Sequence, residues 1–168
     1  IMEFVGKYII RFVVLMLLQI LVFNNIPAIG MISPYLYVAF ILLLPVSMSP
    51  SLVLLMAFAT GFIIDLSINS LGVHASAMTM MAVFRPKILD IMAPRIGYEA
   101  NNEPLMSVFG FGWATRYTLA CVAIHHIMLY FCFTFTVENI SFMFVKVLIN
   151  IILTVLIILI TEKFVIKK

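Results

Sequence analysis

The sequence predicts an all-α protein, a polytopic membrane bundle of six transmembrane helices. Of its 168 residues, 65% are hydrophobic and only 10% are charged, whereas soluble domains carry about 25% charged residues. The chain therefore lacks the polar residues needed to cover a soluble fold of this length. Its apolar stretches are continuous runs, which do not show the residue-by-residue alternation of a membrane β-barrel. Residues 1–168 are expected to form a single integral membrane domain.

Proline and asparagine residues divide the chain into six apolar segments. Pro50 is placed where the first turn of a helix favours proline. The second and fourth segments are shorter than the roughly 20 residues of a perpendicular crossing. Each of these two is either a short span covered by its neighbours or a re-entrant segment. The expected spans cover about 8–23, 32–44, 51–68, 73–84, 114–135 and 141–160.

The basic residues predict the orientation of the bundle. With a cytoplasmic N-terminus, the cytoplasmic segments contain nine of the ten Lys and Arg residues. The positive-inside rule then places both termini and the loop 85–112 in the cytoplasm. The first part of this loop, "RPKILDIMAPR", is expected to be a short helix at the headgroup level. The following "GYEANNEPL" is interpreted as a solvated turn region.

One carboxylate lies near the end of the third span. Ala57, Gly61 and Asp65 are spaced by four residues, so they share one helical face. Small residues allow a neighbouring helix to approach closely, and Asp65 is therefore expected to face the bundle. Three roles remain open for it: a cap or water-exposed carboxylate at a helix end, an internal ion pair or hydrogen-bond anchor, and a catalytic or proton-carrying group.

The last span carries a polar stripe of Lys146, Asn150 and Thr154, again spaced by four residues. Hydrogen bonding between helices is the expected role of this stripe, and a substrate path is the weaker alternative.

Lys146 is the basic residue that lies outside the cytoplasmic segments, and its expected depth in the bilayer is similar to that of Asp65. Charges kept from water in a membrane need partners. We therefore expect Asp65 and Lys146 to approach each other directly or through one water. His74 and Glu138 are the competing partners.

The remaining polar residues of the spans include adjacent histidines, His125 and His126. They point about 100° apart on a helix, so both cannot face one site, and hydrogen bonds to a neighbouring helix are expected. A metal site would need His74, Asp65 and one of this pair to converge, and no metal-ligand spacing supports it. The sequence predicts no metal and no cofactor. It also predicts no enzyme and no nucleic-acid binding, because it contains no catalytic motif and no dense basic run.

Two longer stretches of the sequence combine several of these residues. In "GFIIDLSINSLGVHASAMTMMAVFRP", a Gly–Asp helix end leads through a Gly-x-x-Ala turn to Arg85 and a proline. The other stretch, "GWATRYTLACVAIHHIMLYF", contains the histidine pair. In the order and spacing of these stretches the chain resembles the MreD family, the membrane subunit of the bacterial rod-shape and cell-elongation machinery. The resemblance extends over nearly the whole chain.

This resemblance implies a non-enzymatic scaffold in the bacterial cytoplasmic (inner) membrane that supports lateral peptidoglycan synthesis and cell shape. The implied partners are an MreC-like bitopic protein, with MreB, RodA and a class-B penicillin-binding transpeptidase in the same complex, all beside membrane lipid.

The family fold is similar to that of the substrate-binding subunits of energy-coupling-factor transporters, so the alternative function is vitamin binding. Those subunits typically carry an Ala-x-x-x-Ala spacing in their first span. The first span here, "YIIRFVVLMLLQILVF", has no alanine, which favours the scaffold.

Overall fold

The computed structural model describes residues 2–25, 33–99, 102–134 and 140–164, and all regular structure within these ranges is helical. A π-helical turn and a 3₁₀ turn continue the first helix. The long helices are α1 (Met2–Leu17), α3 (Pro50–Ile68), α4 (Val73–Ile91), α6 (Phe111–Thr134) and α7 (Ile140–Phe164). The short elements are η1 (Leu18–Val22), η2 (Phe23–Asn25), α2 (Val38–Leu42) and α5 (Met106–Phe109).

Within the described part of the chain, four helical stretches are long and apolar enough to cross a membrane: Val5–Asn25, Pro50–Ile68, Phe111–Phe133 and Met143–Phe164. Their outward faces carry exposed side chains such as Leu55, Phe144 and Ile152. In water such a surface would be unfavourable, whereas lipid tails are as apolar as these side chains. The class of protein that the fold indicates is therefore an α-helical membrane protein.

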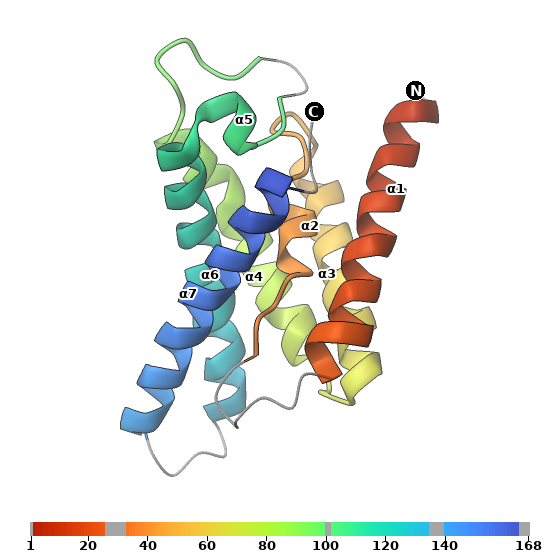
Figure 1. Ribbon diagram of the computed structural model, residues 1–168, viewed down its shortest axis with the longest axis vertical. Helices are drawn as coiled ribbons and strands as arrows, with labels where there is room; N and C mark the ends of the chain where they lie inside the picture. The colour runs from red at the N-terminus through yellow and green to blue at the C-terminus, as the bar shows by residue number, and fades with distance from the viewer. Residues whose placement is uncertain (1, 26–32, 100–101, 135–139, 165–168) are drawn as a thin grey trace.

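The long helices pack in chain order. The helix α3 lies on α4, α4 on α6, and α6 on α7, while α1 contacts α2. The start of α1, the end of α7, α5 and the turn before α3 all lie at one end of the bundle (Figure 1). This end, here called the basic end, also holds Lys7, Arg95 and Lys163. The tight turn between α3 and α4 lies at the opposite end.

The second apolar segment is not the continuous helix expected over 32–44. Only Val38–Leu42 is helical, and the residues 33–35 are extended. Pro34 disfavours a helical conformation at the residue before it. Because an extended residue advances about 3.3 Å and a helical one about 1.5 Å, residues 33–45 run from the opposite end of the bundle to the basic end (Figure 1). This stretch is called the crossing segment below.

The crossing segment lies in the core of the bundle. Every side chain from Leu36 to Leu44 is at most 3% exposed. An irregular backbone is tolerated at membrane depth only where it is covered by protein or lines a cavity, since lipid supplies no hydrogen bonds. The backbone of the crossing segment must therefore find partners on the surrounding helices.

The fourth expected span ends too early. α4 continues from Val73 to Ile91 and contains Pro86, so the separate short helix expected after residue 84 does not form. A proline inside a helix removes one backbone hydrogen bond, and here the helix continues through it. Pro50 begins α3 as expected, after Ser49, whose side chain accepts a hydrogen bond from the backbone N–H of Leu52.

Candidate functional site

The polar stripe of α7 binds the extended start of the crossing segment. Asn150 Oδ1 accepts a hydrogen bond from the backbone N–H of Ser33 (2.5 Å), and Thr154 Oγ1 accepts one from the backbone N–H of Tyr35 (3.1 Å). Asn150 Nδ2 also donates to the carbonyl oxygen of Lys146 (2.8 Å). Hydrogen bonding between elements, the role expected for this stripe, is therefore what Asn150 and Thr154 perform.

Gln19, on the π-helical turn η1, continues this pattern. Its Oε1 accepts a hydrogen bond from the backbone N–H of Tyr37 (3.3 Å), and its Nε2 donates to the carbonyl oxygen of Pro34 (3.3 Å). The side chain is fully buried. A glutamine in an otherwise apolar helix is thus explained by the backbone groups that it satisfies.

The C-terminal end of α2 is covered by two arginines and a tyrosine. The last carbonyl groups of any helix lack partners within the helix, and cations near them interact favourably with the helix dipole. Here each of three consecutive carbonyl oxygens accepts a hydrogen bond from a buried side chain of α1, α4 or α6. The pairs are Leu42 with Tyr117 Oη (2.9 Å), Leu43 with Arg11 Nη1 (3.1 Å) and Leu44 with Arg85 Nη2.

Arg85 is therefore a buried structural residue. Its Nε donates to the hydroxyl oxygen of Tyr117 at 2.9 Å, so the arginine and the tyrosine act as one unit around the end of α2. The permanent charge of arginine suits this position, and its fork of donors can reach two acceptors at once.

Glu103 joins α1 to the loop between α4 and α6. Its carboxylate accepts hydrogen bonds from Lys7 Nζ (2.7 Å), Tyr8 Oη (2.5 Å) and Arg11 Nη2 (3.0 Å). Burial raises the pKa of Glu103, but the hydrogen bonds from Lys7, Tyr8 and Arg11 outweigh burial and hold that pKa below its ordinary value. Sequence reasoning missed this residue, since "GYEANNEPL" was expected to be a solvated turn and Glu103 is buried.

The same loop makes two further connections at the basic end. The carbonyl oxygen of Asn102 accepts a hydrogen bond from the backbone N–H of Val46 (2.9 Å). Glu162 on α7 accepts one from the backbone N–H of Met106. Residues 102–106 therefore connect the first helix, the end of the crossing segment and the last helix.

A cluster of histidine and tyrosine rings surrounds the middle of the crossing segment. The hydroxyl of Tyr37 lies 2.8 Å from His74 Nδ1 and 2.8 Å from His125 Nε2. The ring of Tyr35 packs against three imidazoles with centroid separations between 5.3 and 5.9 Å. His125 and His126 both line this cluster, although their 100° separation on the helix argued against a shared site. Their rings converge because Tyr35 enters between the helices and packs against both of them, while Tyr37 contacts His125.

Hydrogen-bond geometry assigns the proton positions of the neutral cluster. The carbonyl oxygen of Val122 can only accept, so the His126 Nδ1 that lies 2.9 Å from it carries a proton. His125 Nδ1 lies 3.4 Å from this protonated nitrogen, and two N–H groups would repel each other there. The proton of the neutral His125 is therefore assigned to Nε2. His125 therefore donates to Tyr37, and the Tyr37 hydroxyl donates to His74 Nδ1.

Thr154 closes this chain on α7. Its hydroxyl lies 3.3 Å from His126 Nε2, which accepts from it, and its oxygen accepts from the backbone of Tyr35. The cluster is therefore a hydrogen-bond chain that ties the crossing segment to α4, α6 and α7.

Asp65 caps the neighbouring helix. Its two oxygens accept hydrogen bonds from the backbone N–H groups of His74 (3.0 Å) and Ala75 (2.8 Å), and the Ser70 hydroxyl donates to it as well. These amides belong to the first turn of α4, whose N-cap residue is Gly72 and has no side chain to offer. A carboxylate at that position satisfies the free N–H groups and suits the helix dipole.

The expected ion pair between Asp65 and Lys146 is wrong. The carboxylate is occupied by the amides of α4, and the ion pairs among the described residues both involve Glu103. The helices that carry the two residues are also not neighbours, because α3 packs on α4 and α7 packs on α6. His74, a competing partner, contacts Asp65 through its backbone N–H. Glu138 lies outside the described residues.

Gly61 allows the close contact that brings Asp65 to α4. A Cβ atom at this position would lie 2.5 Å from the Ala75 Cα and from the carbonyl oxygen of His74. Ala57, one turn earlier, is fully buried. The Ala57–Gly61–Asp65 face therefore packs against α4, as the spacing indicated.

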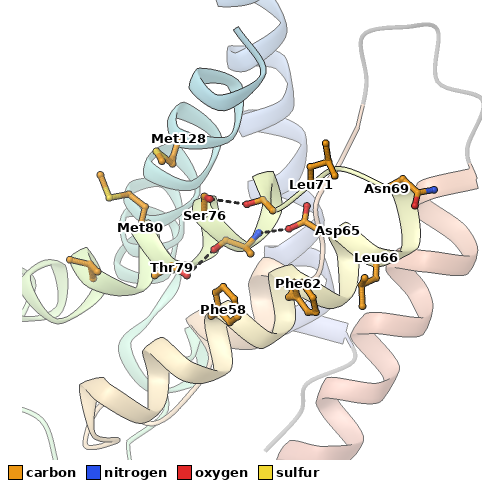
Figure 2. A pocket seen from close by; sticks show the side chains of 13 residues that line it. Phe58, Phe62, Asp65, Leu66, Asn69, Leu71, Ser76, Thr79, Met80 and Met128 are labelled. Atoms are coloured by element: carbon orange, nitrogen blue, oxygen red, sulfur yellow. Dashed lines mark hydrogen bonds between the residues drawn. The ribbon is translucent and has the colours of Figure 1, made fainter. Parts of the chain in front are cut away.

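An open groove of about 810 Å³ follows the contact between α3 and α4. Figure 2 shows Phe58 and Phe62 along one side of it and Ser76 and Thr79 on the other. The two hydroxyls donate to carbonyl oxygens of their own helix, Ser76 to Gly72 (2.7 Å) and Thr79 to Ala75 (2.8 Å). The two hydroxyls are thus engaged with the protein. Apart from Asp65 and the exposed Asn69, the other side chains that line the groove are apolar.

The described residues contain no group of three or more His, Cys, Asp or Glu side chains that could hold a metal ion. The geometry instead defines an α-helical membrane protein whose buried polar side chains hold its own backbone. Comparison with family models, with curated proteins and with solved structures found no match for this chain.

Proposed function

We propose that this protein is a multi-pass scaffold of the bacterial inner membrane that acts in the cell-elongation complex, as its resemblance to the MreD family implies. The observation that supports a scaffold is the use of its buried polar residues. Asp65, His74, Arg85 and His125 each contact protein groups inside the bundle. Because these side chains are engaged inside the bundle, contacts with other molecules are expected at the outer surface of the protein.

The residues that carry the family resemblance are also the residues that hold this architecture. Gly61 and Asp65 join α3 to α4, Arg85 covers the end of α2, and the histidine pair lines the ring cluster. A sequence pattern explained by internal packing is typical of a structural subunit.

The proposed topology has six crossings with both termini in the cytoplasm. The basic end would face the cytoplasm, which agrees with the positive-inside rule. The second crossing is the segment 33–45 and the fourth is α4. A cysteine scan in a cysteine-free background tests this topology with a membrane-impermeant thiol reagent on intact cells. Labelling is expected at Leu71→Cys and not at Glu99→Cys, and the reverse result would contradict the proposed orientation.

Depletion of the protein in its source bacterium tests the scaffold role. Rod-shaped cells are expected to become round and the wall-synthesis complex to disperse, while the purified protein turns over no lipid-linked wall precursor. Co-purification with an MreC-like bitopic protein is the expected partner result. Normal cell shape together with the loss of uptake of one vitamin would overturn the scaffold in favour of the vitamin-binding alternative.

A further inference from the structure

The Tyr37 hydroxyl is the direct link between the crossing segment and the histidines. It accepts from His125 Nε2–H and donates to His74 Nδ1, each at 2.8 Å. This arrangement requires that His74 Nδ1 carry no proton. The contact between the crossing segment and α4 therefore depends on the protonation state of one imidazole.

His74 differs from the other two histidines in its surroundings. It lies in the first turn of α4, at the end of the bundle opposite the basic end, and its backbone N–H donates to the Asp65 carboxylate at 3.0 Å. A positive charge on the imidazole of His74 would thus have a negative charge close by. Opposite charges at short range favour the charged form of a group.

His125 and His126 have no such compensation. His125 Nδ1 faces the N–H of His126 at 3.4 Å, so a second proton on His125 would place two donors against each other. Among the described residues, the other titratable or charged groups around the cluster are Tyr35, Tyr37 and Tyr130. The facing side chains of α7, Asn150 and Thr154, do not titrate, and Lys146 lies one turn from Asn150. Of the three histidines, His74 is therefore the one placed to take up a proton.

We propose that His74 is a proton-binding site and that its protonation releases the crossing segment from α4. A proton on Nδ1 faces the hydroxyl of Tyr37, which already accepts from His125. The hydroxyl oxygen has two lone pairs, so it then accepts from both imidazoles, and its own proton loses the acceptor that His74 supplied. A buried positive charge and a buried donor without an acceptor both destabilise the docked arrangement. His74 therefore binds a proton more tightly when the crossing segment is released from α4 than when it is docked on α4. For that reason acid shifts the population toward the released state.

The accessibility of the crossing segment tests this proposal. A single cysteine at Ala39, a buried position of α2, becomes accessible to a thiol reagent when the crossing segment is released. A single cysteine at Leu71, which is 99% exposed, gives the reference labelling rate of an accessible thiol at each pH. In liposomes, the labelling rate at Ala39→Cys relative to Leu71→Cys is expected to rise about tenfold from pH 8 to pH 5.5, the scale of one hydrogen bond. In His74→Gln, which cannot take up the proton, the ratio is expected to stay flat.

A rise that persists in His74→Gln, or an unchanged ratio in the parent protein, would overturn the proposal. Nitrogen-15 spectra of labelled histidines give a second measurement that needs no substitution in the cluster. They are expected to show His74 becoming an imidazolium first as the pH falls, while His125 and His126 stay neutral. Earlier protonation of either of the pair would contradict the assignment to His74.

Discussion

Asn150 accepts a hydrogen bond from the backbone N–H of Ser33, a residue 117 positions earlier in the chain. This contact typifies the interior of the bundle, where a side chain of one helix satisfies the backbone of a segment that is not continuously helical. Gln19, Thr154 and the residues around the end of α2 do the same. Polar residues in apolar helices are costly in lipid, and here each is offset by a backbone group that would otherwise lack a partner.

Replacement of Asp65 should destabilise the protein, whereas replacement of Lys146 should not. Asp65→Ala leaves two amides of α4 without an acceptor, and a loss of about 1–3 kcal/mol in the free energy of unfolding is expected. Lys146→Met should change it by less than about 0.5 kcal/mol. Denaturant unfolding in detergent micelles measures both variants and the double variant. If Lys146→Met restored the stability lost in Asp65→Ala, this result would indicate an ion pair between the two side chains and contradict the structure.

Gly61→Ala should destabilise the contact between α3 and α4. The added methyl group meets backbone atoms of α4 at 2.5 Å, and backbone cannot move aside as a flexible side chain can. Overpacking of this kind costs about 1–3 kcal/mol. Gly6→Ala is the matched control, since nothing lies within 4 Å of that position. It should stabilise α1 by about 0.5–1 kcal/mol, and equal effects of the two substitutions would contradict the close approach at Gly61.

Glu103→Gln should weaken the attachment of α1. The substitution leaves the buried Arg11 guanidinium without its carboxylate, and removal of one partner from a buried ion pair costs about 3–5 kcal/mol. Glu99→Gln, at an exposed position of the same loop, is the control and should have little effect. Thermal unfolding of the detergent-solubilised protein distinguishes the two. Similar melting temperatures for both variants would show that Glu103 does not hold α1.

The same carboxylate predicts an acid limit to stability. The pKa of Glu103 in the folded protein lies below its ordinary value of 4.5, so the unfolded chain binds a proton more readily than the folded one. The contribution of Glu103 is therefore fully present above pH 4.5 and is lost as the pH falls through the lower folded value. Unfolding free energies measured from pH 7 down to pH 3 should fall more steeply in the parent protein than in Glu103→Gln. Parallel curves would contradict this assignment.

Local patterns predicted α3 well and the crossing segment poorly. Pro50 and the small-residue spacing of Ala57 and Gly61 are short-range signals, and α3 begins and ends within one residue of the expected span. The conformation of residues 33–45 depends on side chains as distant as Thr154, which periodicity cannot detect. Pro34 and Pro45 were the available signals of an interrupted helix.

The prediction of the role of Asp65 was limited by the same lack of long-range information. The four-residue spacing with Ala57 and Gly61 indicated that Asp65 faces the bundle, and capping was among the roles that this spacing left open. Lys146 was chosen as its partner because it lies at a similar expected depth and because charges kept from water need opposite charges. The choice was made without knowledge of which helices are neighbours. Glu103 was missed because asparagines and a proline around it are typical of solvated turns. Only its contacts with α1 reveal a buried carboxylate.

Hydrogen exchange of three backbone amides tests most directly whether side chains of the helices hold the crossing segment. In lipid nanodiscs at neutral pH, the amides of Ser33, Tyr35 and Tyr37 should exchange slowly, and each should exchange about tenfold faster when its own partner is replaced. The matched variants are Asn150→Leu for Ser33, Thr154→Val for Tyr35 and Gln19→Leu for Tyr37. The reference is the amide of Ile96, a residue that is 93% exposed. If the three amides already exchange in the parent protein as fast as this reference, or if none responds to its own partner, the crossing segment is not held in the way described.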